Sequence, residues 1–243
     1  MVIELAAGAA IPILYEDRVV LAVDKPAGWM LAPDDWDRTQ RNLQLALTSS
    51  INGGDYWAKS RGIKYIRSVH RLDAETSGVL LLAKTPGALS VLSELFETRQ
   101  VEKKYLAVVE GIPKEQHWIC KDPIGPEPGT RGRMKVDPEA GKEAETEFNV
   151  IKVLKNRALI EARPLTGRTH QIRVHLAASG TAVVGDALYA GMKVGAKMPM
   201  ALRSIEIAYP DPFQRKRVHV RAPTEAFLKQ FGFFDPPQKP PTA

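Results

Sequence analysis

The fold of this chain is decided by the stretch Ser68-Val69-His70-Arg71-Leu72-Asp73-Ala74-Glu75-Thr76-Ser77-Gly78-Val79-Leu80-Leu81-Leu82-Ala83-Lys84. Its second half, residues 78–83, is an uninterrupted apolar run, and a run this short predicts a strand buried on both faces. Its first half is a polar turn that sets a guanidinium close to a carboxylate. Charged side chains are rarely buried unless they are paired or used, so Arg71 and Asp73 mark a candidate site.

Length, composition and charge narrow the class of protein. With 243 residues the chain is long enough to bury a substantial core, and no apolar stretch is long enough to span a bilayer. The first residues lack the basic head of a signal peptide. The single Cys120 excludes a disulfide framework and a thiolate-rich metal site, so we expect a cytoplasmic protein. The net charge of +6 favours a polyanionic partner such as nucleic acid.

Around this stretch the chain alternates short strands with few helices. Polar turns between apolar runs predict strand pairs, and Thr85 followed by Pro86 predicts a capped helix start. The long segment 121–141, rich in Pro and Gly, predicts a surface loop or ribbon. We expect helices near 39–49 and from 86, and strands at 13–15, 19–23, 104–111, 145–154, 158–162, 183–186, 204–209 and 215–220.

A second concentration of polar residues lies at 164–180, which reads Pro-Leu-Thr-Gly-Arg-Thr-His-Gln-Ile-Arg-Val-His-Leu-Ala-Ala-Ser-Gly. This pattern predicts a helix capped by Thr169 and ended by Gly180. Ile172 would face the core, whereas Arg173 lies on a different face. An arginine on a small-residue face near a helix start is placed to point into a cleft.

Residue types leave several interpretations open. Asp73 could brace a turn with Arg71 as its local ion partner, because structural ion pairs are common. The run 70–73 superficially resembles the catalytic loop of protein kinases, but there the aspartate directly follows the arginine. A Gly-rich nucleotide loop, a P-loop and a dinucleotide fingerprint are all absent from the sequence. These absences argue against nucleotide-dependent chemistry.

Two further site classes use the same residues. His170 and His175 with Asp73 could be imagined as a metal site, but their spacing fits no ligand pattern and we expect no metal. A hydroxyl nucleophile from the pair 76–77 would need a histidine base, for which His70 is a weak candidate. A core or hydrogen-bonded role for each histidine is the simpler interpretation.

Taken together, the motifs of this chain resemble those of the RluA-type branch of the RNA pseudouridine synthases, in the same order. The motifs are Lys25-Pro26-Ala27-Gly28, His70-Arg71-Leu72-Asp73 with Thr76-Ser77-Gly78, Lys104-Tyr105-Leu106-Ala107-Val108, the region 131–147, Thr166-Gly167-Arg168-Thr169-His170-Gln171-Ile172-Arg173-Val174-His175, and Gly185-Asp186. The resemblance implies an enzyme that isomerises uridine to pseudouridine in ribosomal or transfer RNA without a cofactor or metal. It implies an α+β fold, with a mixed, mostly antiparallel sheet in two halves around a central basic cleft. It also implies one catalytic domain over 1–243 with its core at about 13–230, no N-terminal RNA-binding module, and a Pro-rich tail from 236.

The resemblance also assigns roles to single residues. Asp73 matches the catalytic aspartate, Tyr105 the tyrosine that stacks on the flipped base, and Arg173 the arginine that pairs with the aspartate. Arg71 matches the arginine that enters the stack where the target base has left. Five other side chains are expected to bind RNA, namely His70, Arg131, Arg133, Arg168 and His170. Further phosphate contacts are expected from Arg61, Lys64, Arg67, Lys135 and residues 215–217.

The chain departs from the family pattern at two places. Residues 29–33 lack the usual His-Pro end, and residues 201–203 read Ala-Leu-Arg where Leu-His-Ala is common. The partner we expect is structured RNA, bound by a monomer. Two rivals stay open at this point: a non-catalytic RNA-binding protein on the same scaffold, and a base-flipping nucleoside hydrolase, which would need a water-activating base.

Overall fold

The computed structural model describes residues 1–5, 9–31, 41–130, 132–191, 198–214 and 216–236. The strands are β1 (Val2–Glu4), β2 (Ala10–Glu16), β3 (Val20–Lys25), β4 (Arg67–Ser68), β5 (Ser77–Ala83), β6 (Glu102–Glu110), β7 (His117–Cys120), β8 (Ile124–Pro126), β9 (Met134–Val136), β10 (Thr146–Leu154), β11 (Arg157–Pro164), β12 (Leu202–Pro210) and β13 (Arg217–Arg221). The helices are α1 (Leu43–Gly53), α2 (Tyr56–Lys59), α3 (Pro86–Glu97), α4 (Gln171–Ala178) and α5 (Glu225–Phe231).

One eleven-stranded sheet organises the described chain, in the order β1-β2-β3-β5-β12-β6-β11-β10-β7, with β4 beside β5 and β13 beside β12. Its described strand pairs are antiparallel except that of β5 with β12. A separate ribbon is formed by β8 and β9. The structure therefore confirms the predicted α+β fold with a mixed, mostly antiparallel sheet.

The central strand β5 is buried on both faces, as its apolar run predicts. Val79 and Leu81 belong to one apolar cluster, which also holds Leu92 of α3. Leu80 belongs to the cluster on the other face, together with Leu47 of α1. Because successive side chains of a strand point to opposite faces, a continuous apolar run serves a strand that has helices on both sides.

Gly78 permits the close approach of β5 to β12. Its φ is +111°, and a Cβ atom there would lie 2.0 Å from the carbonyl oxygen of Ser204. Only glycine has both the conformational freedom and the space for this position. The first residues of β5 can therefore lie beside β12, where the two halves of the sheet join.

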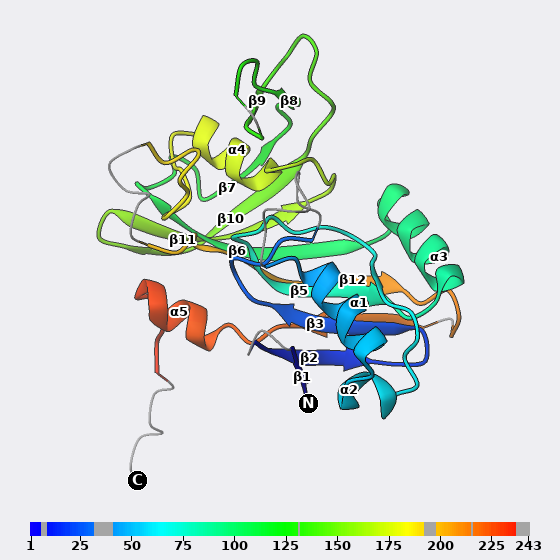
Figure 1. The fold of residues 1–243 in the computed structure, drawn as a ribbon. Helices are drawn as coiled ribbons and strands as arrows, with labels where there is room; N and C mark the ends of the chain where they lie inside the picture. Colours follow the sequence, from blue (N-terminus) through cyan, green and yellow to red (C-terminus); the bar gives the residue numbers. More distant parts are fainter. Residues whose placement is uncertain (6–8, 32–40, 131, 192–197, 215, 237–243) are drawn as a thin grey trace.

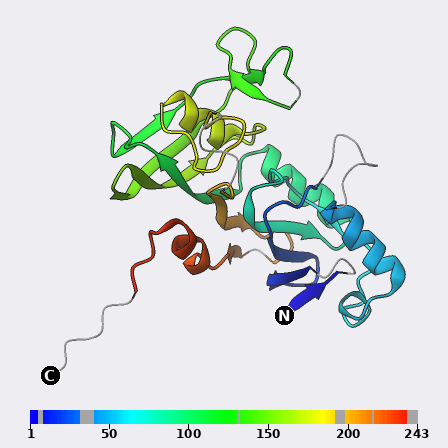
Figure 2. The same ribbon diagram turned by 60° about the vertical axis from the view of Figure 1, so that its left-hand side comes forward.

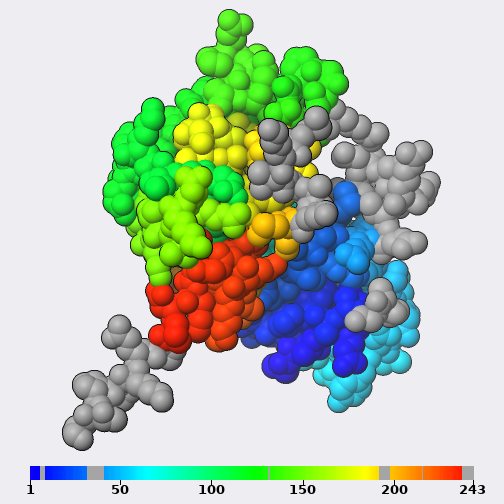
Figure 3. Space-filling model, turned by 90° about the vertical axis from the view of Figure 1, so that its left-hand side faces the viewer, coloured from blue at the N-terminus to red at the C-terminus, as the bar shows by residue number. Residues whose placement is uncertain are grey.

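The sheet carries two groups of helices and loops on either side of this junction. The N-terminal half, blue to green in Figure 1, holds β1 to β5 with α1, α2 and α3. The other half holds β6, β11, β10 and β7 with α4 and the ribbon β8–β9, and the turned view in Figure 2 separates the two. In Figure 3 the C-terminal residues in orange and red lie against both halves on one face.

Most predicted elements are confirmed, with local differences. The helix expected near 39–49 is observed at Leu43–Gly53, because the Asn42 side chain accepts from the Leu45 N–H and Gly54 ends the helix in the left-handed region. The short helix α2 was not predicted. The strand expected at 183–186 is wrong: Val183 forms only an isolated bridge with Val109. Residues 39–40 and the tail from 237 lie outside the described residues.

Candidate active site

The loop between β4 and β5 carries Asp73, and hydrogen bonds from the segment 25–28 hold this loop in place. The carbonyl oxygen of Ala74 accepts hydrogen bonds from the Lys25 ammonium at 2.9 Å and from the Gly28 N–H at 2.7 Å. Lys25 is fully buried and also donates to the Trp29 carbonyl at 2.8 Å, and burial lowers its pKa to about 8. The loop with Asp73 is thus held in place by a segment 49 residues earlier in the chain.

The start of α4 is fixed by the side chain of Gln171 and not by a Thr169 cap. The prediction for Thr169 is wrong, because the N-cap residue is His170, at φ 56° and without a side-chain cap bond. Gln171 Oε1 accepts from the Arg168 N–H at 2.9 Å and from the Thr166 hydroxyl at 2.6 Å. Its amide donates to the carbonyl of Glu145 at 2.9 Å. The glutamine therefore stabilises the loop that precedes the helix.

Arg173 leaves this helix start and reaches Asp73 from the opposite side of the cavity. Its guanidinium donates to both carboxylate oxygens of the buried Asp186, from Nε to Oδ2 at 2.6 Å and from Nη2 to Oδ1 at 2.8 Å. The remaining Nη1 donates to Asp73 Oδ2 at 3.0 Å. Burial alone would lower the pKa of Arg173, but the ion pairs with Asp186 and Asp73 raise it above its usual range. A permanently charged donor thus faces Asp73 in a fixed direction.

Tyr189 supports the same arginine. The Arg173 guanidinium lies over the Tyr189 ring, 5.1 Å from its centroid. The Tyr189 hydroxyl pairs with His170 Nδ1 at 3.0 Å and accepts from the Met134 N–H of β9 at 2.9 Å. His170 Nε2 lies 4.0 Å from Asp73 Oδ2, and burial lowers the pKa of this histidine. A neutral imidazole therefore lines the site beside the charged arginine.

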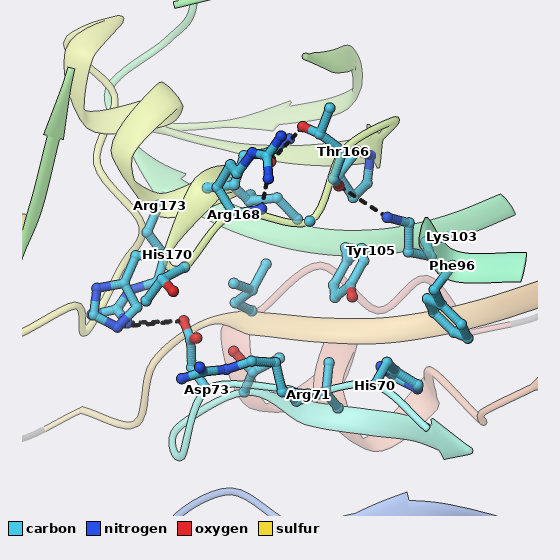
Figure 4. A pocket seen from close by; sticks show the side chains of 18 of the residues that line it. His70, Arg71, Asp73, Phe96, Lys103, Tyr105, Thr166, Arg168, His170 and Arg173 are labelled. Atoms are coloured by element: carbon cyan, nitrogen blue, oxygen red, sulfur yellow. Dashed lines mark hydrogen bonds and ion pairs between the residues drawn. The ribbon is translucent and has the colours of Figure 1, made fainter. Parts of the chain in front are cut away.

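Tyr105 projects from β6 into the space above Asp73. Its side chain is buried, and burial and then the charge of Asp73 raise the pKa of its phenol above the usual range. The phenol stays protonated at neutral pH. Figure 4 shows Tyr105 between the Asp73 loop on one side and the segment with Arg168 on the other. Its ring is one wall of the cavity.

These side chains surround a cavity of about 490 Å³, which lies in the size range of small-molecule sites. The structure brings together seven of the residues proposed from the sequence, and Figure 4 shows them around one space: Asp73, Tyr105, Arg173, Arg71, His70, Arg168 and His170. A second hollow shares Arg71, Asp73 and Arg173 with the first. Asp73 therefore lies where two hollows meet.

The residues expected to bind RNA differ in how far the protein itself uses them. Arg71 is exposed at the cavity. His70 stacks on Phe96, with ring centroids 4.8 Å apart, and its Nε2 accepts from the Leu81 N–H at 3.1 Å. Burial lowers the pKa of His70 to about 3. His70 is thus a neutral, structurally engaged ring, and RNA binding by it stays a prediction.

The arginines of the half that contains α4 and the ribbon β8–β9 also differ in whether they line the cavity. Arg168 lines the cavity and donates through Nε to the Glu143 carbonyl at 2.8 Å. Arg133 does not line it: this residue lies beside the Tyr189 ring, 5.5 Å from the centroid, and pairs with Glu127 at 3.0 Å. Arg131 and Arg215 lie outside the described residues.

The alternative site classes find no support in the described chain. Ser77 Oγ accepts from Arg203 Nη1 at 3.2 Å, and the His70 nitrogen that could act as base is already bonded to Leu81. His175 is fully buried between Thr146 and the Asp122 carbonyl. No group of three metal-binding side chains occurs among the described residues. Within those residues, no helix has the length and apolar character needed to cross a bilayer.

The roles of four residues of the site were not predicted from the sequence. Asp186 was quoted as part of a motif but not as the partner of Arg173, and Lys25 was not recognised as the support of the Asp73 loop. Lys103, which lines the cavity beside Tyr105, and Tyr189 were not singled out. For Lys25 and Asp186 the available signal was a charge within a quoted motif, because a charge that becomes buried needs a partner.

The departure at residues 201–203 has a structural explanation. Arg203 is buried and donates to Asp24 Oδ2 at 2.6 Å, to the Pro223 carbonyl at 3.1 Å and to Ser77. It joins β12 to β3, β5 and the segment after β13, and it does not line the cavity. Of the departure at 29–33, residues 32 and 33 lie outside the described residues.

Comparisons with known proteins agree with this geometry. Residues 19–178 match the RNA pseudouridylate synthase family. The chain is 35% identical to an uncharacterized RNA pseudouridine synthase of Zymomonas mobilis, over 91% of this chain and 97% of that one. It is 33% identical to the dual-specificity RNA pseudouridine synthase RluA of Escherichia coli, over 80% of this chain and 84% of that one. The structure of human RNA pseudouridylate synthase domain containing 1 superposes with a TM-score of 0.70 at 27% identity, over 88% of this chain and 83% of that one.

The chain therefore belongs to the RNA pseudouridylate synthase family. It is an RNA pseudouridine synthase, an isomerase, with the fold of that family.

Proposed function

We propose that this enzyme isomerises a specific uridine in ribosomal or transfer RNA and that Asp73 is its catalytic residue. The observation that carries the proposal is the carboxylate of Asp73, which faces a cavity of nucleotide size with Arg173 Nη1 3.0 Å away. Similarity to an enzyme named as a dual-specificity RNA pseudouridine synthase supports an RNA substrate.

The chemistry requires a carboxylate at this place. Isomerisation breaks the bond from N1 of uracil to C1′ of the ribose and forms a bond from C5 to C1′, while C5 gives up a proton and N1 gains one. Asp73 can attack the base ring, attack C1′, or remove a sugar proton, and all three routes use an ionised carboxylate. Arg173 stabilises that ion, and Asp186 holds Arg173 so that no reorganisation is needed during the reaction. The bond changes balance without an electron acceptor, a metal or a cofactor.

The target nucleotide must leave its helix to reach Asp73. Extruding a base costs a few kcal/mol, whereas stacking a base on an aromatic side chain returns about 1–3 kcal/mol. The buried face of Tyr105 supplies such a stacking surface inside the cavity. Arg71, exposed at the cavity mouth, would occupy the place that the base has left. Together they offset the cost of flipping.

Phosphate contacts supply the rest of the binding. Basic side chains that line the cavity and are not buried, such as Arg71, Arg99 and Arg168, belong to a chain with an excess of positive charge. Affinity for RNA should therefore fall as salt rises. We further propose that residues 1–243 act as one catalytic domain, as a monomer in the cytoplasm.

The test is the appearance of pseudouridine. Total RNA from cells with and without the gene is mapped for pseudouridine, and the purified protein is then given unmodified transcripts that cover the candidate sites. The proposal predicts one or a few uridines that convert only when the protein is present. Unchanged maps together with inactive purified protein would contradict it.

A further inference from the structure

Lys103 is a cation in the cavity for which the proposed mechanism has no use. It precedes Tyr105 by two residues on β6, and because side chains alternate along a strand, both project from the same face into the cavity. Its ammonium donates to the Thr166 carbonyl at 2.9 Å. Among the described residues no carboxylate pairs with it, and burial alone lowers its pKa to about 8.

A half-buried ammonium without a counter-ion is costly to keep. Lysine carries three N–H donors, and the bond to Thr166 uses one of them. If Lys103 served only to join β6 to the loop before α4, an uncharged donor would do so at a lower cost of desolvation. The unused donors lie in a cavity that is open to a ligand, so they are available to a ligand acceptor.

Lys103 and Asp73 occupy opposite ends of the cavity. Figure 4 shows Asp73 with Arg173 and His170 at one end, Lys103 with Phe96 at the other, and Tyr105 between them. The electrostatics agree with this order. The charge of Asp73 acts on Tyr105, whereas the charge of Lys103 acts on His70.

The chemistry then fixes which edge of the base meets Lys103. The sugar must lie at Asp73, where the glycosidic bond breaks, so the base extends along Tyr105 toward the other end. In uracil the atom directly across the ring from N1 is C4, which carries the acceptor O4. We propose that Lys103 donates a hydrogen bond to O4 and so selects uridine over cytidine, whose amino group at C4 is a donor. This inference rests on the proposed function.

The same ammonium also suits the product. After isomerisation the ribose is attached to C5, and the atom across the ring from C5 is C2, which carries O2. Rotation of the ring thus brings one carbonyl acceptor to the place of the other. A cation that donates to any carbonyl oxygen can hold the base before and after the rearrangement.

The experiment is a double-mutant cycle between the protein and the base. Short oligoribonucleotides covering the mapped position carry uridine, 4-thiouridine, 2-thiouridine or cytidine there. Dissociation constants for each oligomer are measured with three proteins: Lys103→Met, Lys103→Arg and the protein that keeps Lys103. All three also carry Asp73→Asn, which prevents turnover. Pseudouridine formation by the wild-type enzyme is measured in parallel, and thermal unfolding reports whether each variant is folded.

We expect 4-thiouridine to weaken binding about 3- to 10-fold when Lys103 is present, because sulfur is a poorer acceptor. Lys103→Met should weaken uridine binding about 10- to 100-fold, bind uridine and cytidine equally, and show no further loss with 4-thiouridine. Lys103→Arg should keep the preference for uridine. The 2-thiouridine oligomer should bind like uridine in every protein.

Three results would overturn the inference. Equal losses of affinity on replacing uridine by 4-thiouridine, with lysine and with methionine at position 103, would show that Lys103 does not contact O4. If Lys103→Met does not fold, the comparison of uridine with 4-thiouridine in the protein that keeps Lys103 still tests this contact. Equal losses for uridine and cytidine with Lys103→Met, with a shallower salt dependence, would assign Lys103 to a phosphate. A wild-type enzyme that forms no pseudouridine would remove the proposed function as well, whereas the first two results leave it standing.

Discussion

The two arginines that flank Asp73 have opposite environments. Arg173 on α4 is buried and held by two carboxylate oxygens of Asp186, whereas Arg71 on the β4–β5 loop is exposed at the cavity mouth. A guanidinium held on several sides cannot move with the substrate, so Arg173 suits the stabilisation of a fixed charge. A guanidinium with free rotamers can follow the RNA, which is what filling a vacated stack requires.

Of the tests that compare the two arginines, removing the support of Arg173 should have the largest effect. Asp186→Asn removes a buried counter-ion, and we expect kcat to fall about 100-fold with KM little changed, because Arg173 loses its direction toward Asp73. Breaking a buried ion pair should also lower the free energy of unfolding by about 3 kcal/mol. Single-turnover kinetics and chemical denaturation measure the two effects.

A matched control separates chemistry from stability. Asp24 pairs with Arg203 at 2.6 Å in a mostly buried pair, and neither residue lines the cavity. Asp24→Asn should lower the free energy of unfolding while leaving kcat nearly unchanged. Equal losses of kcat in both variants would show that Asp186 acts through the fold alone.

Removing the exposed arginine, Arg71, should give a smaller effect that depends on the substrate. Arg71→Ala should lower turnover on a stem-loop about 10-fold more than on a flexible single strand, because only the stem has a stack to fill. Arg67→Ala removes the same charge from exposed β4, outside the cavity, and should affect both RNAs equally. Equal losses on both RNAs with Arg71→Ala would contradict the stack-filling role.

The stacking wall that Tyr105 forms should tolerate loss of its hydroxyl. Tyr105→Phe keeps the ring face, so RNA affinity should stay within about twofold, and any loss, about 2- to 10-fold, should appear in the rate. Tyr105→Leu keeps an apolar side chain without the ring and should weaken binding. A collapse of binding in Tyr105→Phe would contradict stacking as the main role of this residue.

The smallest effect concerns His70, the ring beside Arg71. Burial lowers the pKa of His70 to about 3, so the unfolded chain takes up a proton below pH 6.5 and the folded chain does not. The stability from this group is complete above pH 6.5 and is lost as pH falls toward 3. Between pH 7 and pH 5, His70→Gln should lose about 1–2 kcal/mol less free energy of unfolding than wild type. The other histidines are common to both proteins, so equal losses would contradict the assignment.

The Asp73 loop and α4 also differ in how far the sequence predicts them. The buried strand β5 and the helix after Thr85 follow from local patterns of apolar and capping residues, and both are confirmed. The start of α4 is not predicted correctly, because Gln171 replaces a Thr169 cap by bonds to residues up to 26 positions away. Local rules do not contain such partners.

The ion pairs of the site have the same limitation. Asp73 and Arg173 are 100 residues apart, and their pairing was expected from the family resemblance, not from spacing. The roles of Asp186 and Lys103 have no periodic signal, because their partners, Arg173 on α4 and Thr166 in the loop before it, are brought to them by the fold. The sequence names the charged residues, but only the fold decides which of them are buried and paired.

The most direct measurement is the rate of pseudouridine formation by Asp73→Asn on the mapped RNA, with binding measured on the same RNA. The substitution keeps the shape of the side chain and removes its charge. The account predicts a loss of about 10⁴-fold or more in rate with RNA affinity within about threefold of wild type, while Glu75→Gln, an exposed carboxylate two residues later, stays active. Normal pseudouridine formation by Asp73→Asn would contradict it.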